Sequence, residues 1–147
     1  MKVILQKVTE ASVTVDSEIV GQIDRGYLLF LGILQGDTSA QAELLAEKIT
    51  KTRLFDSADG KINDQSILDV QGSILVVSQF TLAGRLEKGN RPDYSRAAPP
   101  EDAKVLYEYF IRKLEQMGVQ KVESGEFGAY MGVSLVNDGP VTLIIER

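Results

Sequence analysis

The stretch ILVVSQFTL, residues 74–82, is the most informative part of the sequence. Its β-branched and apolar first half is typical of a buried strand. Ser78, Gln79 and Thr81 then bring three hydrogen-bonding side chains to the end of that strand, just before a glycine-containing basic segment. Buried polar side chains cost stability unless they are paired. They are therefore either satisfied by neighbouring backbone, as most such groups are, or they form a site on a rigid strand that opens into a loop.

Length and composition limit the class of protein. The chain has 147 residues, 44% hydrophobic and 25% charged, which suits one domain, residues 1–147, with a packed core. No apolar run approaches the roughly 20 residues that cross a bilayer. The N-terminal segment alternates like a strand and lacks the apolar core of a signal peptide. We therefore expect a cytoplasmic protein with no membrane partner.

The absence of two residue types limits the chemistry. The sequence contains no cysteine and no histidine, which excludes a thiolate nucleophile, a zinc–sulfur site and a Ser–His pair. Catalysis would have to use backbone donors, hydroxyls, carboxylates, lysine or a group on the substrate. The acidic loop at residues 56–66 lacks the ligand spacing of a calcium-binding loop. We expect neither a metal nor another cofactor.

Charge is distributed unevenly. The net charge of −5 argues against nonspecific binding of nucleic acid over the whole surface, and we expect no DNA partner. The irregular segment 83–98 is locally basic, and a loop of that length in a compact domain is often functional. It is either a solvated loop or a local RNA-binding patch. Its basic residues are Arg85, Lys88, Arg91 and Arg96.

Hydrophobic periodicity predicts an α+β fold. Two helices are expected. The first spans residues 38–53, where a capping residue precedes apolar residues at helical spacing. The second runs from Pro99-Pro100, which mark its start, to Gly118, which marks its end. We expect mainly antiparallel sheets, curled into a β-barrel-like core and covered by both helices. The predicted strands are 3–8 and 12–15 (in a hairpin with 19–23), 27–34, 67–70 (in a hairpin with 74–82), 119–123, 131–136 and, after a turn at 137–140, 141–145.

Several ordered segments resemble the D-aminoacyl-tRNA deacylases, and the resemblance covers nearly the whole chain. The segments are QKVTEASVTV near the N-terminus, GDT at 36–38, SQFTL at 78–82, GNRP at 89–92, AAPP at 97–100, FGAYM at 127–131 and NDGPVT at 137–142. An ordered series of this kind is a specific match, unlike a single short motif.

The resemblance implies a homodimer that frees tRNA from D-amino acids, and also from glycine mischarged on tRNA-Ala, for proofreading. In such a dimer, the strand end of one subunit meets the Gly-cisPro motif, Gly139-Pro140, of the other. The implied catalytic residues are Ser78, Gln79, Phe80 and Thr81. The implied adenosine and substrate residues are Phe80, Phe127, Ala129, Met131 and Asn137, and the basic residues of segment 83–98 would contact tRNA.

Thr81 is a candidate nucleophile, but a threonine hydroxyl needs an activating base. With no histidine in the chain and no carboxylate or lysine at close spacing, we favour direct attack by water, assisted by a ribose hydroxyl of the substrate. Backbone N–H groups of residues 79–81 would hold the oxyanion. The alternatives from the residues are a noncatalytic dimeric RNA-binding β module and a small-molecule binding protein.

Overall fold

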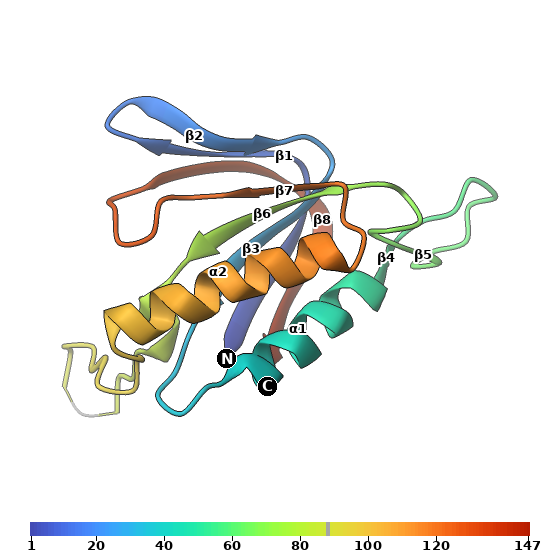
Figure 1. The fold of residues 1–147 in the computed structure, drawn as a ribbon. Helices are drawn as coiled ribbons and strands as arrows, with labels where there is room; N and C mark the ends of the chain where they lie inside the picture. The colour runs from blue at the N-terminus through green and yellow to red at the C-terminus, as the bar shows by residue number, and fades with distance from the viewer. Residues whose placement is uncertain (88) are drawn as a thin grey trace.

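The computed structural model describes residues 1–87 and 89–147, and its architecture is a strongly curved mixed sheet with two helices packed side by side on one face (Figure 1). This confirms the predicted α+β class and the barrel-shaped sheet with two covering helices. The strands are β1 (Lys2–Val15), β2 (Glu18–Ile23), β3 (Gly26–Gly32), β4 (Arg53–Phe55), β5 (Gln65–Ser66), β6 (Ser73–Ser78), β7 (Lys121–Ser124) and β8 (Gly132–Glu146). The helices are α1 (Ser39–Lys51), α2 (Pro100–Gln116) and the 3₁₀ helix η1 (Phe80–Ala83).

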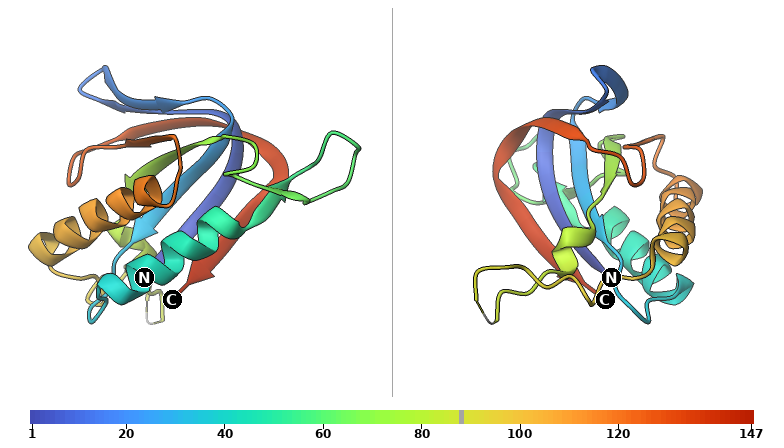
Figure 2. Two further views of the ribbon diagram at one scale, coloured as in Figure 1. Left: turned by 45° about the vertical axis from the view of Figure 1, so that its right-hand side comes forward. Right: turned by 90° about the vertical axis from the view of Figure 1, so that its left-hand side faces the viewer.

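The long strand β1 pairs with three other strands, β2, β3 and β8. The main sheet has the order β2-β1-β3-β6-β7, and β8 pairs with the other edge of β1. The pairings of β1 are antiparallel, whereas β6 is parallel to both β3 and β7. The sheet curls until β2 approaches β7, where Lys121 Nζ donates to the Gln22 carbonyl at 2.8 Å. Figure 2 shows the resulting curvature, with both helices outside the curve.

Both faces of β3 and β6 are buried. On β6, Ile74 and Val76 face the helices, whereas Leu75 and Val77 join the cluster inside the curved sheet. Strands covered on both sides read as continuous apolar runs rather than alternating ones. This explains why the run at 74–77 predicted a buried strand.

The two long helices begin where the sequence predicts. Thr38 caps α1 and forms a capping box with Gln41, which satisfies N–H groups that a helix leaves unpaired at its start. Pro99 is the N-cap of α2, and Pro100 is its first residue. Within the described residues, no helix has the length and apolar character needed to cross a membrane.

The second predicted hairpin is wrong. Residues 67–71 form turns, and β5 pairs with β4 instead of with β6. Strand β6 lies in parallel between β3 and β7, where its two apolar faces are both covered. The turn predicted at residues 137–140 is likewise absent, because β8 runs continuously from Gly132 to Glu146 with two register shifts against β1.

Candidate active site

The predicted catalytic stretch lies where the chain leaves the sheet. Ser78 is the last residue of β6 and pairs with Leu31 of β3. The Gln79 N–H then donates to the Leu31 carbonyl at 2.8 Å, and η1 begins at Phe80. Ser78, Gln79 and Thr81 are half-buried, whereas Phe80 is 60% exposed. The strand end therefore presents an aromatic side chain on a rigid support.

Two backbone N–H groups at the start of η1 have no acceptor within that helix. The first N–H groups of a helix have no acceptor within it. In η1 these belong to Phe80 and Thr81, because the first intrahelical donor is Leu82 N, which reaches the Gln79 carbonyl at 3.2 Å. The third predicted donor, Gln79 N–H, is already committed to Leu31. Of the three predicted backbone donors, only the N–H groups of Phe80 and Thr81 are therefore left without an acceptor in η1 or β3.

The Thr81 hydroxyl is paired with an amide. Gln79 Nε2 donates a hydrogen bond to Thr81 Oγ1, and this is the hydrogen bond found at that hydroxyl among the described residues. A carboxamide is not a base and cannot remove the hydroxyl proton. The contact therefore positions Thr81 without activating it.

A glycine in β3 seats η1 against the sheet. An ideal Cβ on Gly32 would lie 2.8 Å from Leu82 Cβ and 3.0 Å from the Gln79 carbonyl oxygen. Both distances are shorter than ordinary carbon contacts, so η1 can pack here only because Gly32 has no side chain. A glycine inside an apolar strand signals such a close approach, and the sequence analysis missed this signal.

The predicted adenosine wall comes from the β7–β8 connection. Phe127, Ala129 and Met131 are half-buried there. Phe127 packs on Tyr107 of α2 with ring centroids 5.6 Å apart, whereas Met131 packs toward the interior cluster. Phe80, the other predicted wall residue, pairs instead with Tyr94, which the sequence analysis did not single out.

Tyr107 fixes this connection to β6. Its hydroxyl donates to the Val76 carbonyl at 2.8 Å, and Gly125 N donates to the same carbonyl at 2.9 Å. Burial raises the pKa of Tyr107 to about 12, so the hydroxyl stays protonated and keeps donating. Tyr107 therefore supports the site without serving as an acid or base near neutral pH.

The Gly139-Pro140 motif lies on exposed β8, and its peptide bond is cis, as the resemblance implies. Asn137 Nδ2 donates to the carbonyls of Lys7, at 2.9 Å, and Val141, at 3.0 Å, so it spans the motif. The Lys7 ammonium, itself largely buried, pairs with Asp138 at 3.2 Å. These contacts hold the segment on both sides and place Asn137 beside the motif.

Within one chain, the two motifs lie far apart. On β8, Gly139 and Pro140 lie opposite Lys7 of β1, and Lys7 in turn pairs with Tyr27 of β3. Ser78 of β6 pairs with a different residue of β3, Leu31. The four residues from Tyr27 to Leu31 span about 13 Å, and the three strand spacings from β8 to β6 add about 14 Å across the sheet. The motifs cannot share one site within a single chain.

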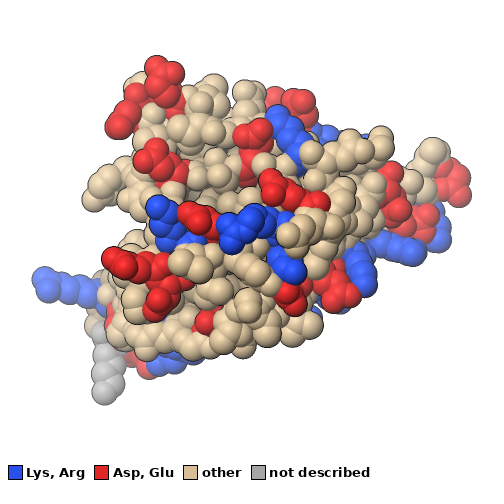
Figure 3. Space-filling model, in the orientation of Figure 1, with Lys and Arg blue, Asp and Glu red and all other residues tan. Residues whose placement is uncertain are grey.

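The basic segment is folded back on itself. Arg85 and Asp93 exchange backbone hydrogen bonds at 2.9 Å, and Arg85 pairs with Glu87 at 3.4 Å. Arg91 and Arg96 are exposed, and Lys88 lies outside the described residues. Elsewhere acidic and basic side chains are intermixed, as the face in Figure 3 shows.

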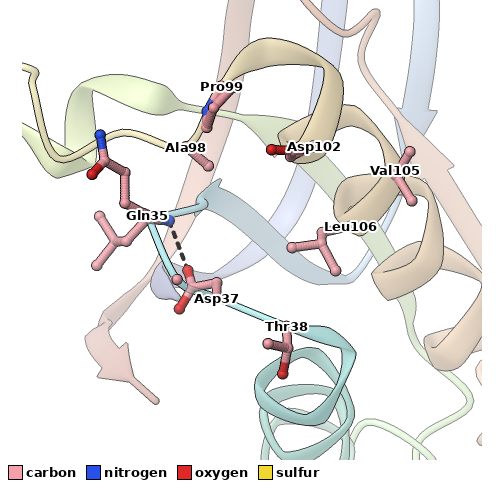
Figure 4. Close-up of a pocket in the computed structure, with 10 residues that line it drawn as sticks. Gln35, Asp37, Thr38, Ala98, Pro99, Asp102, Val105 and Leu106 are labelled. Carbon is pink, nitrogen blue, oxygen red and sulfur yellow. Dashed lines mark hydrogen bonds between the residues drawn. The ribbon is translucent and has the colours of Figure 1, made fainter.

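A cavity of about 570 Å³ lies between the β3–α1 connection and the start of α2 (Figure 4). None of the predicted site residues that the structure describes lines it, although the N–H of its lining residue Gln35 donates to the Arg96 carbonyl at 2.9 Å. The Asp37 carboxylate at its edge is already used, since it accepts from Leu34 N at 2.7 Å and from the Met1 amino group at 2.6 Å. The lining residues are Leu34, Gln35, Gly36, Asp37, Thr38, Ala98, Pro99, Asp102, Val105 and Leu106.

Comparison with known proteins identifies relatives that match nearly the whole chain. The D-aminoacyl-tRNA deacylase of Geotalea uraniireducens is 53% identical over 146 residues, covering 99% of this chain and 93% of the relative. The enzyme of the same name from Halalkalibacterium halodurans is also 53% identical and is covered to 99%. A solved structure described as c-Myc DNA Unwinding Element Binding Protein has a TM-score of 0.94 and 42% identity, with 100% of this chain and 99% of that chain covered. The D-Tyr-tRNA(Tyr) deacylase profile matches residues 4–146, and the chain therefore belongs to this family of D-aminoacyl-tRNA deacylases.

Proposed function

We propose that the chain hydrolyses the ester of D-aminoacyl-tRNA by direct attack of water, in the cytoplasm where tRNA is charged. Water adds to the ester carbon, the bond to the ribose oxygen breaks, and that oxygen takes up a proton. The products are the D-amino acid and tRNA with a free hydroxyl. Family membership supports the hydrolase over a noncatalytic RNA-binding module or a small-molecule binding protein.

The observation that carries this mechanism is the start of η1. The N–H groups of Phe80 and Thr81 can hold the oxygen that becomes negative in the transition state, and each such donor contributes roughly 3–4 kcal/mol. Because Thr81 Oγ1 accepts from Gln79, neither side chain supplies a base. The neighbouring ribose hydroxyl of the substrate supplies the proton relay, and Ser78 and Gln79 position the strand end.

Removing the Thr81 hydroxyl tests water attack. Thr81→Val keeps the shape of the side chain, and we expect kcat to fall less than about tenfold, whereas deletion of an activated nucleophile costs several orders of magnitude. Thr81→Ser should stay close to the wild type. Single-turnover kinetics with D-tyrosyl-tRNA measure both variants. A trapped acyl-enzyme, or a Thr81→Val variant as inactive as the uncatalysed reaction, would contradict the mechanism.

The complete site requires a second copy of the chain. Gly139 and Pro140 are exposed and lie too far from Ser78 to act in the same chain. A homodimer would place this motif over the partner's η1, so that each subunit completes the other's site. Asn137, together with Lys7 and Asp138, would then hold the motif in position.

Two further surfaces receive the RNA. Phe127, Ala129 and Met131 would form the wall for the terminal adenosine, since aromatic and apolar side chains stack on bases. The guanidinium groups of segment 83–98 would contact phosphates.

A backbone wall from the partner selects by exclusion. Such a wall collides with an L side chain and leaves a D side chain free, so selectivity comes from repulsion. We therefore expect the wild type to cleave D-tyrosyl-tRNA and glycyl-tRNA, glycine on tRNA-Ala included, and to spare L-tyrosyl-tRNA. Initial rates on the three substrates measure this. A wild type that spares glycyl-tRNA while cleaving the D-aminoacyl ester would show that a pocket for the D side chain, rather than exclusion, sets the selectivity.

A further inference from the structure

Phe80 and Tyr94 form an exposed aromatic pair beside the catalytic strand end. Their ring centroids are 5.2 Å apart and their planes lie at 69°, an edge-to-face arrangement. Phe80 is 60% exposed and Tyr94 is 37% exposed. Exposed aromatic surface that is contiguous with a site is characteristic of ligand binding, and Tyr94 has no role in the chemistry proposed above.

The structure holds Tyr94 firmly in place. An ideal Cβ on Gly84 would lie 2.9 Å from Tyr94 Cε1, so the ring rests where only glycine leaves room. The Tyr94 carbonyl accepts from Ala97 N at 2.9 Å, and Gln35 Nε2 donates to the next carbonyl, that of Ser95, at 2.7 Å. Because the ring is fixed before binding, the Tyr94 side chain loses little conformational entropy when a ligand stacks on it.

The charges around the pair favour a nucleic acid. Tyr94 belongs to the same segment as Arg85, Arg91 and Arg96. Of the two acids in this segment, Glu87 pairs with Arg85 at 3.4 Å. Hydrogen bonds from the Ser95 N–H and hydroxyl to the Asp93 carboxylate lower the pKa of Asp93, so it stays negatively charged. Arg85, Arg91 and Arg96 still outnumber the two acids. Aromatic rings among arginines are the usual surface for single-stranded nucleic acid.

We propose that Tyr94, seated on Phe80, is a stacking platform for the base that precedes the terminal adenosine in the single-stranded 3′ end of tRNA. The inference rests on the proposed function, because it places the ester at the Phe80 and Thr81 N–H groups, and Phe80 is the first residue of η1. The terminal nucleoside lies at the ester, and the preceding nucleotide extends from there along the segment that carries Tyr94 and the arginines.

The test compares two non-hydrolysable inhibitors, each with a D-tyrosyl amide at the 3′ position. One is the single nucleoside adenosine and the other is the CCA trinucleotide. We expect the wild type to bind the trinucleotide at least about tenfold more tightly, since stacking contributes roughly 1–3 kcal/mol per base. Tyr94→Ala should reduce this advantage about tenfold without weakening the adenosine inhibitor, and Tyr94→Phe should preserve it.

Hydrolysis of D-tyrosyl-tRNA provides the second readout. Tyr94→Ala should raise KM about tenfold and leave kcat within about twofold, because stacking precedes the chemistry. The salt dependence of KM should not change, since no charge is removed, whereas Arg91→Gln should weaken it. Tyr109→Ala, the same truncation on α2 where the hydroxyl donates to Glu43, is the matched control and should leave the inhibitor ratio unchanged.

Each other outcome is decisive. An equal loss on both inhibitors, or a lower kcat, would make Tyr94 a structural support of η1 and overturn the subsite. A wild type with no preference for the trinucleotide overturns it as well. If Tyr94→Ala instead weakens self-association in sedimentation, a second copy covers the pair and the RNA assignment is wrong. Failure of the proposed function looks different, because the wild type would then not hydrolyse D-tyrosyl-tRNA at all.

Discussion

Replacing Gly32 with alanine is expected to lower kcat for D-aminoacyl-tRNA at least about 100-fold, because a displacement near 1 Å of groups that align a reaction costs about that much. The new methyl would lie 2.8 Å from Leu82 Cβ and 3.0 Å from the Gln79 carbonyl. Since β3 is fixed between β1 and β6, η1 must move outward. The Phe80 and Thr81 N–H groups then no longer meet the developing oxyanion.

A matched variant separates this effect from general overpacking. Gly72→Ala places its Cβ 2.6 Å from Ile67 Cδ1, at the opposite end of β6. Gly32→Ala should cost about 1–3 kcal/mol of stability. Gly72→Ala should cost less, because Ile67 Cδ1 is the end of a flexible side chain and can move aside. Thermal unfolding measures both losses. Only Gly32→Ala should lose activity at temperatures where both variants are folded. Equal activity in the two variants would mean that η1 does not hold the catalytic donors.

Gly139→Ala is expected to reduce deacylation strongly without destabilising the chain. A Cβ on Gly139 would meet nothing closer than Asn137 Oδ1 at 4.0 Å within its own chain, so the isolated fold has room for it. In the proposed dimer, the same methyl would enter the partner's site beside the substrate. We expect kcat/KM to fall at least about 100-fold, by the same positioning argument. Gly132→Ala on the same strand, with its Cβ 3.9 Å from the Thr14 carbonyl, is the matched control.

Mixed dimers then decide whether the site is shared. In a dimer of one Gly32→Ala chain and one Gly139→Ala chain, both defects fall in one of the two sites. The other site keeps an intact η1 and an intact partner motif. We expect a purified heterodimer to recover about half of the wild-type activity from two inactive parents, as two-fold symmetry requires. A heterodimer as inactive as its parents would show that each site is built within one chain.

Much of the fold was predictable from local pattern. Alternation predicted strands at residues 3–8 and 12–15, which the structure joins into the single strand β1. A capping residue and apolar spacing predicted α1, and Pro100 marked the start of α2. The pairing of β6 was not predictable, because an apolar run shows that both faces are buried but does not identify the neighbouring strands. The hairpin predicted for residues 67–82 failed for this reason.

The residue types available in the sequence limit the possible chemistry. Without histidine or cysteine, Thr81 has no conventional activating partner, and the ordered segments indicate the deacylase family. The spatial arrangement of those residues comes from the fold. Register places Gly32 under η1 and folding of the basic segment places Tyr94 on Phe80, while strand order separates Ser78 from Gly139. Such contacts join residues distant in the chain, and they depend on strand order and register, which local sequence periodicity does not encode.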